Sequence, residues 1–141
     1  MREFFDTSVL VAAFWGGHPN HEASVRRLGA ANRKHSACAL HTVAEVYAVM
    51  TALPVKPPLP PEQVLLFVQE IRERLVLVTL QEAEYFATLE STAGREFTSG
   101  RVYDALLLRC AAKVKAHVIY TWNLRHFQTI APELASRIRT P

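Results

Sequence analysis

The sequence predicts an α/β domain built around a parallel sheet. Short runs rich in β-branched and aromatic residues alternate with longer stretches in which apolar residues recur at helical spacing, a pattern typical of a chain that passes repeatedly from strand to helix. The chain has 141 residues, and a chain of about 150 residues buries roughly 70% of its unfolded surface. We therefore expect a single domain over residues 1–141.

The composition is that of an ordinary globular protein. Half of the residues are hydrophobic and 21% are charged, which argues against disorder. No apolar run approaches the roughly 18 residues that span a bilayer, and no leader segment opens the chain, so we expect a cytoplasmic protein that does not enter a membrane. The net charge of +3 permits a phosphate-rich partner without requiring one. Cys38 and Cys110 lie in apolar segments and are predicted to be buried and free.

In the first half of the chain, two predicted strands alternate with three predicted helices. REFF and SACAL are short apolar runs that predict strands over residues 2–5 and 36–40. TSVLVAAF opens with hydroxyl residues suited to an N-cap, HEASVRRLGAANR has the alternating charge of a surface helix, and HTVAEVYAVMTAL is apolar over most of its surface. These three segments predict helices over residues 7–14, 21–33 and 41–53.

The second half begins with a proline-rich connection. PVKPPLPP has five prolines in eight positions and predicts an extended surface loop, because proline lacks the amide donor that a helix needs. LVLVTL and HVIYTW predict buried strands, NLRHF predicts a turn or short helix, and the C-terminal segment could add an edge strand. The helices are expected over residues 62–75, 81–94 and 102–116, the strands over 75–80 and 117–122, and the edge strand around 137–139.

Three acidic residues stand apart from the rest. Of the 13 acidic residues only Asp6 and Asp104 are aspartates, and each lies where a loop or strand passes into an apolar helix. Glu45 lies within an apolar helix, whereas most other glutamates fall on charged helix faces. Functional groups gather at the carboxyl ends of parallel strands, where Asp6 and Asn123 are expected. Glu45 and Asp104 can face the same crevice from their helices.

Such a group of carboxylates predicts a bound divalent cation. At roughly 4 Å and an effective dielectric constant near 20, each pair of like charges costs about 4 kcal/mol. Oxygen ligands suit Mg²⁺ or Mn²⁺ better than zinc, which prefers His and Cys. A cation of this kind activates water and offsets the charge of a phosphodiester, which is the chemistry of metal-dependent nucleases. Thr7 and Ser8 can add hydroxyl hydrogen bonds at the same helix start.

Four segments in order, DTSVLVAAF, TVAEVYAVMT, GRVYDALLLRCAA and VIYTWNLRHF, carry a resemblance to a known family. The chain resembles PIN-domain ribonucleases, and most of all the small VapC-type toxins of prokaryotic toxin-antitoxin systems. Each segment is weak evidence by itself, but their order and spacing are specific and extend over nearly the whole length. The resemblance implies a PIN-like three-layer α/β/α domain with a central, mainly parallel sheet of four to five strands.

The resemblance also implies roles for individual residues. Asp6, Glu45 and Asp104 match the metal-binding acids of the family, with Mg²⁺ or Mn²⁺ as the cofactor. Asn123 matches a fourth catalytic position at which many relatives have Asp, and the missing charge puts a second metal ion in doubt. Thr121 matches a Thr or Ser that is common at this strand end.

The implied activity is an endoribonuclease toxin that cleaves structured RNA, such as tRNA or rRNA, by means of a metal-activated water. The implied partners are the RNA substrate, a small antitoxin protein and a second copy of the chain in a homodimer. The antitoxin groove of the family corresponds to segments around residues 8–15 and 40–70. Arg95, Arg101 and Arg125 flank the acids in the predicted structure and could contact RNA phosphates, although plain solvation explains them equally well.

Simpler explanations exist for each residue, and other functions remain open. Asp6 could be only an N-cap, Asp104 a first-turn acid favoured by the helix dipole, and Glu45 a partner for an arginine. Asn123 is the one feature that favours a catalytically weak or inactive PIN-fold module that binds RNA or protein. Phosphoryl transfer on Asp6 lacks the further acid or lysine that it needs, and no glycine-rich turn supports dinucleotide binding.

The histidines point less clearly to a function. His18 and His21 have the spacing of metal ligands, but the proline between them predicts a solvated loop. His41 and His126 are close in sequence to Glu45 and Asn123, so either could line the crevice. No catalytic role is assigned to any of them.

Overall fold

Five parallel strands form one sheet in the computed structural model, which describes residues 1–141. The strands are β1 (Glu3–Phe5), β2 (Ser36–Ala39), β3 (Val76–Val78), β4 (Val118–Tyr120) and β5 (Ile138–Arg139). Their order across the sheet is β3-β2-β1-β4-β5, and every neighbouring pair is parallel. The first strand therefore lies at the centre of the sheet, and all five carboxyl ends lie at one edge.

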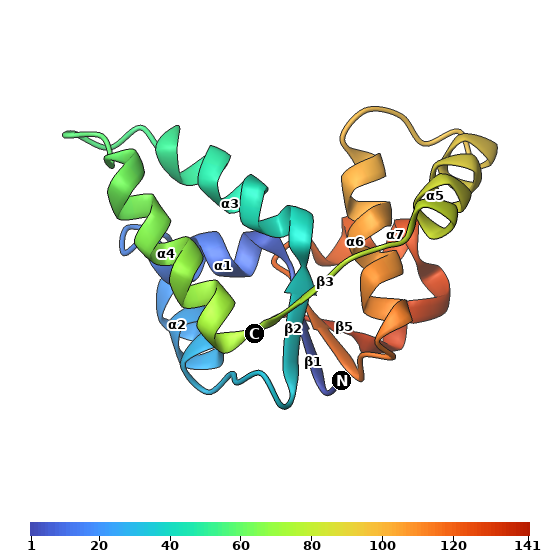
Figure 1. The fold of residues 1–141 in the computed structure, drawn as a ribbon, viewed down its shortest axis with the longest axis horizontal. Helices are drawn as coiled ribbons and strands as arrows, with labels where there is room; N and C mark the ends of the chain where they lie inside the picture. The colour runs from blue at the N-terminus through green and yellow to red at the C-terminus, as the bar shows by residue number, and fades with distance from the viewer.

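Seven α-helices cover the two faces of this sheet (Figure 1). One layer contains α1 (Thr7–Phe14), α2 (His21–Gly29), α3 (Leu40–Thr51) and α4 (Pro61–Arg74). The other contains α5 (Glu82–Gly94), α6 (Arg101–Lys113) and α7 (Leu124–Ile130), followed by a short 3₁₀ helix, Pro132–Arg137. In Figure 1, α3 and α6 rise on either side of the sheet. This arrangement confirms the predicted three-layer α/β/α fold.

Alternation along the strands divides the core into two halves. Phe4 packs with Leu107, Ile119 and Phe127 on the α6 side, whereas its neighbour Phe5 packs on the side of α1, α3 and α4. Successive side chains of a strand point to opposite faces. Both phenylalanines are fully buried, because helices cover both faces of the sheet. This is why REFF reads as a continuous apolar run and not as an alternating one.

Several element boundaries differ from the predictions. The helix predicted over residues 21–33 ends at Gly29, because Asn32 and the residues after it turn back to enter β2. The strand predicted as buried, β3, lies at an edge of the sheet and only Val78 is buried. The 3₁₀ helix was not predicted, whereas the edge strand around residues 137–139 is confirmed as β5.

Two further expectations can be compared with the structure. Cys38 and Cys110 are both buried and free, as predicted. None of the helices is long and apolar enough to cross a lipid bilayer.

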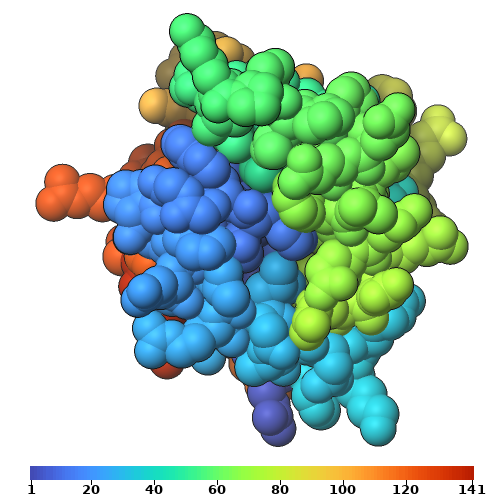
Figure 2. Space-filling model, turned by 90° about the vertical axis from the view of Figure 1, so that its left-hand side faces the viewer, coloured from blue at the N-terminus to red at the C-terminus, as the bar shows by residue number.

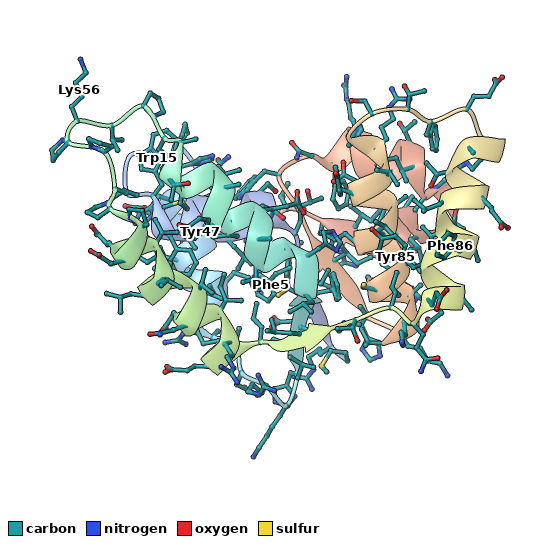
Figure 3. The ribbon with its side chains drawn as sticks, turned by 45° about the horizontal axis from the view of Figure 1, so that its top comes forward. Phe5, Trp15, Tyr47, Lys56, Tyr85 and Phe86 are labelled. Carbon is teal, nitrogen blue, oxygen red and sulfur yellow. The ribbon has the colours of Figure 1, made fainter.

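Because the core extends over both faces of the sheet, we expect that removal of a central aromatic ring lowers the stability of the protein. Phe5→Ala should lower the free energy of unfolding by about 3–5 kcal/mol, because a fully buried ring leaves a cavity. Phe86→Ala provides the control, since Phe86 is 56% exposed on α5 and its loss should change stability by no more than about 0.5 kcal/mol. Figure 3 labels both residues. Urea denaturation measures the difference, and similar losses for the two variants would contradict the assignment of the core.

Candidate active site

Asp6 lies at the carboxyl end of β1, beside Thr121 at the end of β4. Phe5 pairs with Tyr120 in the parallel register, so the next residues leave the sheet side by side. The Asp6 amide donates to the Tyr120 carbonyl oxygen over 2.9 Å. The pairing of β1 with β4, from opposite ends of the chain, therefore fixes the position of this carboxylate.

Two hydroxyl groups hold one oxygen of the Asp6 carboxylate. Ser8 Oγ donates to Oδ2 over 2.7 Å, and Thr121 Oγ1 donates to the same oxygen over 2.8 Å. Each hydroxyl oxygen also accepts a backbone amide, from Trp122 and Asn123 respectively, both over 3.0 Å. Asp6 occupies the N-cap position of α1 without a capping hydrogen bond of good geometry, although the backbone of Ser8 and Thr7 is close enough to lower the pKa of its carboxyl. The start of the helix and the two hydroxyls therefore both act on this carboxylate, and no side chain donates to Oδ1.

Glu45 reaches the same region from α3. Thr7 Oγ1 donates to Glu45 Oε1 over 3.3 Å, and His41 Nε2 lies 3.5 Å from that oxygen. The His41 nitrogen also lies 3.2 Å from the Tyr103 carbonyl oxygen, which links α3 to α6. No arginine pairs with Glu45, so the simpler explanation of an arginine partner is not supported.

Asp104 lies in the first turn of α6, opposite Glu45. Its Oδ2 is 2.7 Å from His126 Nε2 on α7. A first-turn acid is favourable in any helix, but here the histidine also fixes the orientation of the carboxylate.

Two cavities meet at these acids. The first, called here the Asp6 cavity, has a volume of about 250 Å³. The second, called the Arg101 cavity, has a volume of about 610 Å³ and includes Thr98, Ser99 and His126. Glu45 and Asp104 line both cavities. The Asp6 cavity is lined by Asp6, Thr7, Ser8, Val11, His18, Glu45, Val49, Asp104 and Asn123.

The three predicted arginines have different positions. Arg101 lines the cavity named after it and is exposed. Arg125 is exposed on α7 and lines neither cavity. Arg95 lies elsewhere, because its guanidinium donates to the carbonyl oxygens of Ile130 and Thr129 and lines a separate cavity. Arg95 therefore lines neither of the two cavities that contain the acids, and a contact between Arg95 and RNA stays a prediction.

Arg95 and Arg101 both contact the ring of Phe97, which lines the same separate cavity as Arg95. The guanidinium carbon of Arg95 lies 4.5 Å from the centroid of the Phe97 ring, and that of Arg101 lies 5.3 Å from the same centroid. Cations are attracted to the face of an aromatic ring. Phe97 thus connects the anchored arginine to the arginine that faces the acids.

The three acids all have raised pKa values. Burial raises the pKa of Asp6, and the hydroxyls of Ser8 and Thr121 oppose that shift. For Glu45, burial and then the charges of Asp6 and Asp104 raise the pKa to about 7. Burial and the charge of Asp6 also raise the pKa of Asp104. The groups are therefore close enough to repel one another, and a cation would relieve that repulsion.

The donor set fits a hard divalent cation that retains water. No three His, Cys, Asp or Glu side chains close on a single point at ligand distance in this conformation. Magnesium commonly binds through one or two carboxylates and keeps several waters, so full convergence of three side chains is not required. The oxygens of Asp6, Glu45 and Asp104 are the groups that would hold such an ion. The two histidines next to the acids are already engaged with Glu45 and Asp104.

The positions of the histidines differ most from those expected from the sequence. His41 and His126 were considered possible lining residues, and each lies within hydrogen-bonding or ion-pairing distance of an acid. His18 was expected in a solvated loop, but it lines the Asp6 cavity. The only sequence signal for His18 is its place in the turn after the helix that begins beside Asp6.

The raised pKa values predict that the acid cluster lowers the free energy of unfolding by an amount that depends on pH. Glu45 has an ordinary pKa of 4.5 and a folded-state pKa of about 7, so the folded protein binds the proton more tightly than the unfolded chain does. The stability that comes from protonated Glu45 is fully present below pH 4.5 and is lost as the pH rises to about 7. In EDTA, Glu45→Gln should therefore raise the melting temperature at pH 8 more than at pH 5. The gain at pH 8 should exceed the gain at pH 5 by about 1 kcal/mol in the free energy of unfolding after allowance for solvent screening, which is about 4 °C in the melting temperature.

Glu90→Gln is the matched control, because Glu90 is exposed on α5 and lines neither cavity. Thermal melts at both pH values test the prediction. A gain from Glu45→Gln that is equal at the two pH values would contradict a raised pKa.

The chain is similar to known proteins over most of its length. The chain is 36% identical over 124 residues to the protein named Ribonuclease VapC40 in two strains of Mycobacterium tuberculosis, CDC 1551 / Oshkosh and ATCC 25618 / H37Rv. The match covers 88% of this chain and 88% of each relative. The alignment therefore includes most of both proteins.

Three solved structures have a similar fold. VapC20 of M. tuberculosis, described as a toxin that cleaves the sarcin-ricin loop, has a TM-score of 0.68 at 16% identity and covers 86% of this chain and 89% of its own. VapBC2 of Rickettsia felis, bound to a DNA fragment from its promoter, has a TM-score of 0.68 at 17% identity, with coverage of 100% and 99%. VapBC-1 of nontypeable Haemophilus influenzae has a TM-score of 0.64 at 17% identity, with coverage of 99% and 98%.

The model of the PIN domain family matches residues 4–131, a range that includes Asp6, Glu45, Asp104 and Asn123. The chain also has the expected fold and a relative that is similar over most of its length. It therefore belongs to the PIN-domain family and is most like its VapC-type members.

Proposed function

We propose that this protein is a Mg²⁺- or Mn²⁺-dependent endoribonuclease that acts as the toxin of a toxin-antitoxin pair. The observation that carries the proposal is the Asp6 cavity, in which Asp6, Glu45 and Asp104 meet from three different elements. Similarity to a protein named as a ribonuclease supports the same activity. The proposed substrate is structured RNA, such as tRNA or rRNA.

The residues around the acids prepare the site for a phosphodiester. When bound, a divalent cation supplies Lewis acidity that activates water and offsets phosphate charge. Ser8 and Thr121 hold Oδ2 of Asp6, which leaves Oδ1 free of side-chain donors. Thr7 orients Glu45, and His126 orients Asp104. These contacts fix the carboxylates before substrate arrives, and such preorganisation lowers the cost of reaching the transition state.

Arg101 and Asn123 are the proposed contacts for the RNA. Arg101 lines the cavity next to the acids, so its guanidinium can bind a phosphate adjacent to the one that is cleaved. Asn123 lines the Asp6 cavity, and its amide can hydrogen-bond to RNA without adding negative charge. Arg125 is exposed two residues beyond Asn123 and can bind a more distant phosphate.

The layer of helices that contains α3 and α4 offers a surface for protein partners. Five exposed apolar residues on α3 and α4 support the proposal of an antitoxin partner and of a homodimer, since exposed apolar patches mark interaction sites. They are Leu40, Tyr47, Val49, Leu65 and Leu66, which are 47%, 39%, 41%, 49% and 62% exposed, and Val49 also lines the Asp6 cavity. Figure 2 views the face that α1 and α2 form beside α3 and α4.

Cleavage of total tRNA and rRNA by the purified protein tests the activity. Cleavage should require Mg²⁺ or Mn²⁺ and stop in EDTA. Asp6→Asn, Glu45→Gln and Asp104→Asn should each lower kcat/KM by about 100-fold or more, because each removes a charge that stabilises the transition state through the cation. Glu90→Gln should cleave like the wild type.

Cleavage that survives EDTA or all three carboxylate changes would contradict the proposed site. RNA binding without cleavage, under either metal, would favour a PIN-fold binding module in place of a nuclease.

A further inference from the structure

His18 lies in the Asp6 cavity although no helix or strand carries it. It belongs to the turn between α1 and α2 and lines the cavity together with Asp6, Glu45 and Asn123. It also borders a second cavity, which the turn itself and the start of α2 line. It makes no hydrogen bond or ion pair with any of the acids in the structure. The proposed function gives it no role, so its position calls for a physical explanation.

The turn holds the His18 ring in one orientation. The His18 amide donates to the Trp15 carbonyl oxygen over 3.0 Å, and the His21 amide donates to the His18 carbonyl oxygen over 3.1 Å. The Asn20 amide donates to His18 Nδ1 over 3.0 Å. The ring also meets the Trp15 indole edge-on, with centroids 5.8 Å apart. Trp15, labelled in Figure 3, begins this turn.

These contacts determine where the ring carries its proton. A ring nitrogen that accepts a hydrogen bond cannot carry a proton, so Nδ1 is unprotonated and the hydrogen of the neutral ring lies on Nε2. No group in the protein accepts a hydrogen bond from Nε2. His18 is therefore an oriented N–H donor at the edge of a cavity whose charged groups are carboxylates.

We propose that His18 Nε2–H donates a hydrogen bond to a non-bridging oxygen of the RNA phosphate that binds in the Asp6 cavity. This inference rests on the proposed function, since it assumes an RNA substrate. A phosphate oxygen is an acceptor, and carboxylates cannot contact it directly without repulsion. An N–H donor on His18 binds a phosphate oxygen and leaves the acids available to a cation.

Two substitutions distinguish the role of His18 as a hydrogen-bond donor from its role in the structure of the turn. His18→Asn keeps an acceptor near the position of Nδ1, so the Asn20 amide retains a partner, but it removes the outer donor. His18→Gln extends an amide N–H to about the position of Nε2. His35→Asn is the matched control, because His35 is exposed just before β2, at the opposite end of the strands.

The measurements are KM and kcat for cleavage of one tRNA substrate, and the Kd for the same RNA by fluorescence anisotropy in EDTA. His18→Asn should raise KM and Kd about tenfold, the low end for a hydrogen bond to a charged group, with kcat changed less than about threefold. His18→Gln should stay within about threefold of the wild type, and His35→Asn should match it. The Mg²⁺ concentration for half-maximal activity should not change in any variant.

Wild-type RNA affinity in His18→Asn would overturn the proposal. So would equal losses in His18→Asn and His18→Gln, which would assign His18 to the folding of the turn, or a changed Mg²⁺ requirement, which would assign it to the cation. Failure of the proposed function is a separate result, namely no cleavage by the wild type. The anisotropy comparison would then still decide whether His18 binds RNA.

Discussion

Repulsion among three carboxylates is the constraint on which the rest of this site depends. Burial raises the pKa of all three acids, the charge of Asp6 adds to the shifts of Glu45 and Asp104, and the charge of Asp104 adds to that of Glu45. The protein does not offset this charge with lysine or arginine, since the ion pairs of Glu45 and Asp104 are with His41 and His126. Hydroxyls and histidines orient the acids while leaving most of their negative charge in place. A site of this kind is costly to fold in the absence of a cation and well suited to attract one.

The parallel sheet supplies the framework that holds these charges together. Because β1 is central, the residue that follows it has neighbours on both sides, and Thr121 at the end of β4 is one of them. The helices α3 and α6, from the two layers, then bring Glu45 and Asp104 to the same edge. Loss of the β1–β4 register would move Asp6 away from Thr121, so the geometry of the site and the stability of the sheet are linked.

Much of this arrangement could be predicted from the sequence, for physical reasons that also explain the failures. Strand and helix periodicity predicted an α/β domain with a parallel sheet, and the positions of Asp6 and Asn123 after apolar strands predicted the edge at which they lie; the three layers and the place of Thr121 came from the family resemblance. Periodicity does not encode the direction of a turn, so His18 was expected in solvent. An exposed arginine has several possible acceptors, and Arg95 binds carbonyl oxygens instead of facing the acids. The exposure of β3 depends on its place at the edge of the sheet, and the order of strands cannot be read from their sequences.

The ring of Phe97 links the two ends of the segment between α5 and α6. Arg95 donates to the carbonyl oxygens at the end of α7, and both Arg95 and Arg101 contact the Phe97 ring. The segment that joins α5 to α6 is therefore anchored to the third helix of its layer. The guanidinium of Arg101 thus has an aromatic contact in place of an ion pair, which leaves its charge unneutralised beside the acids.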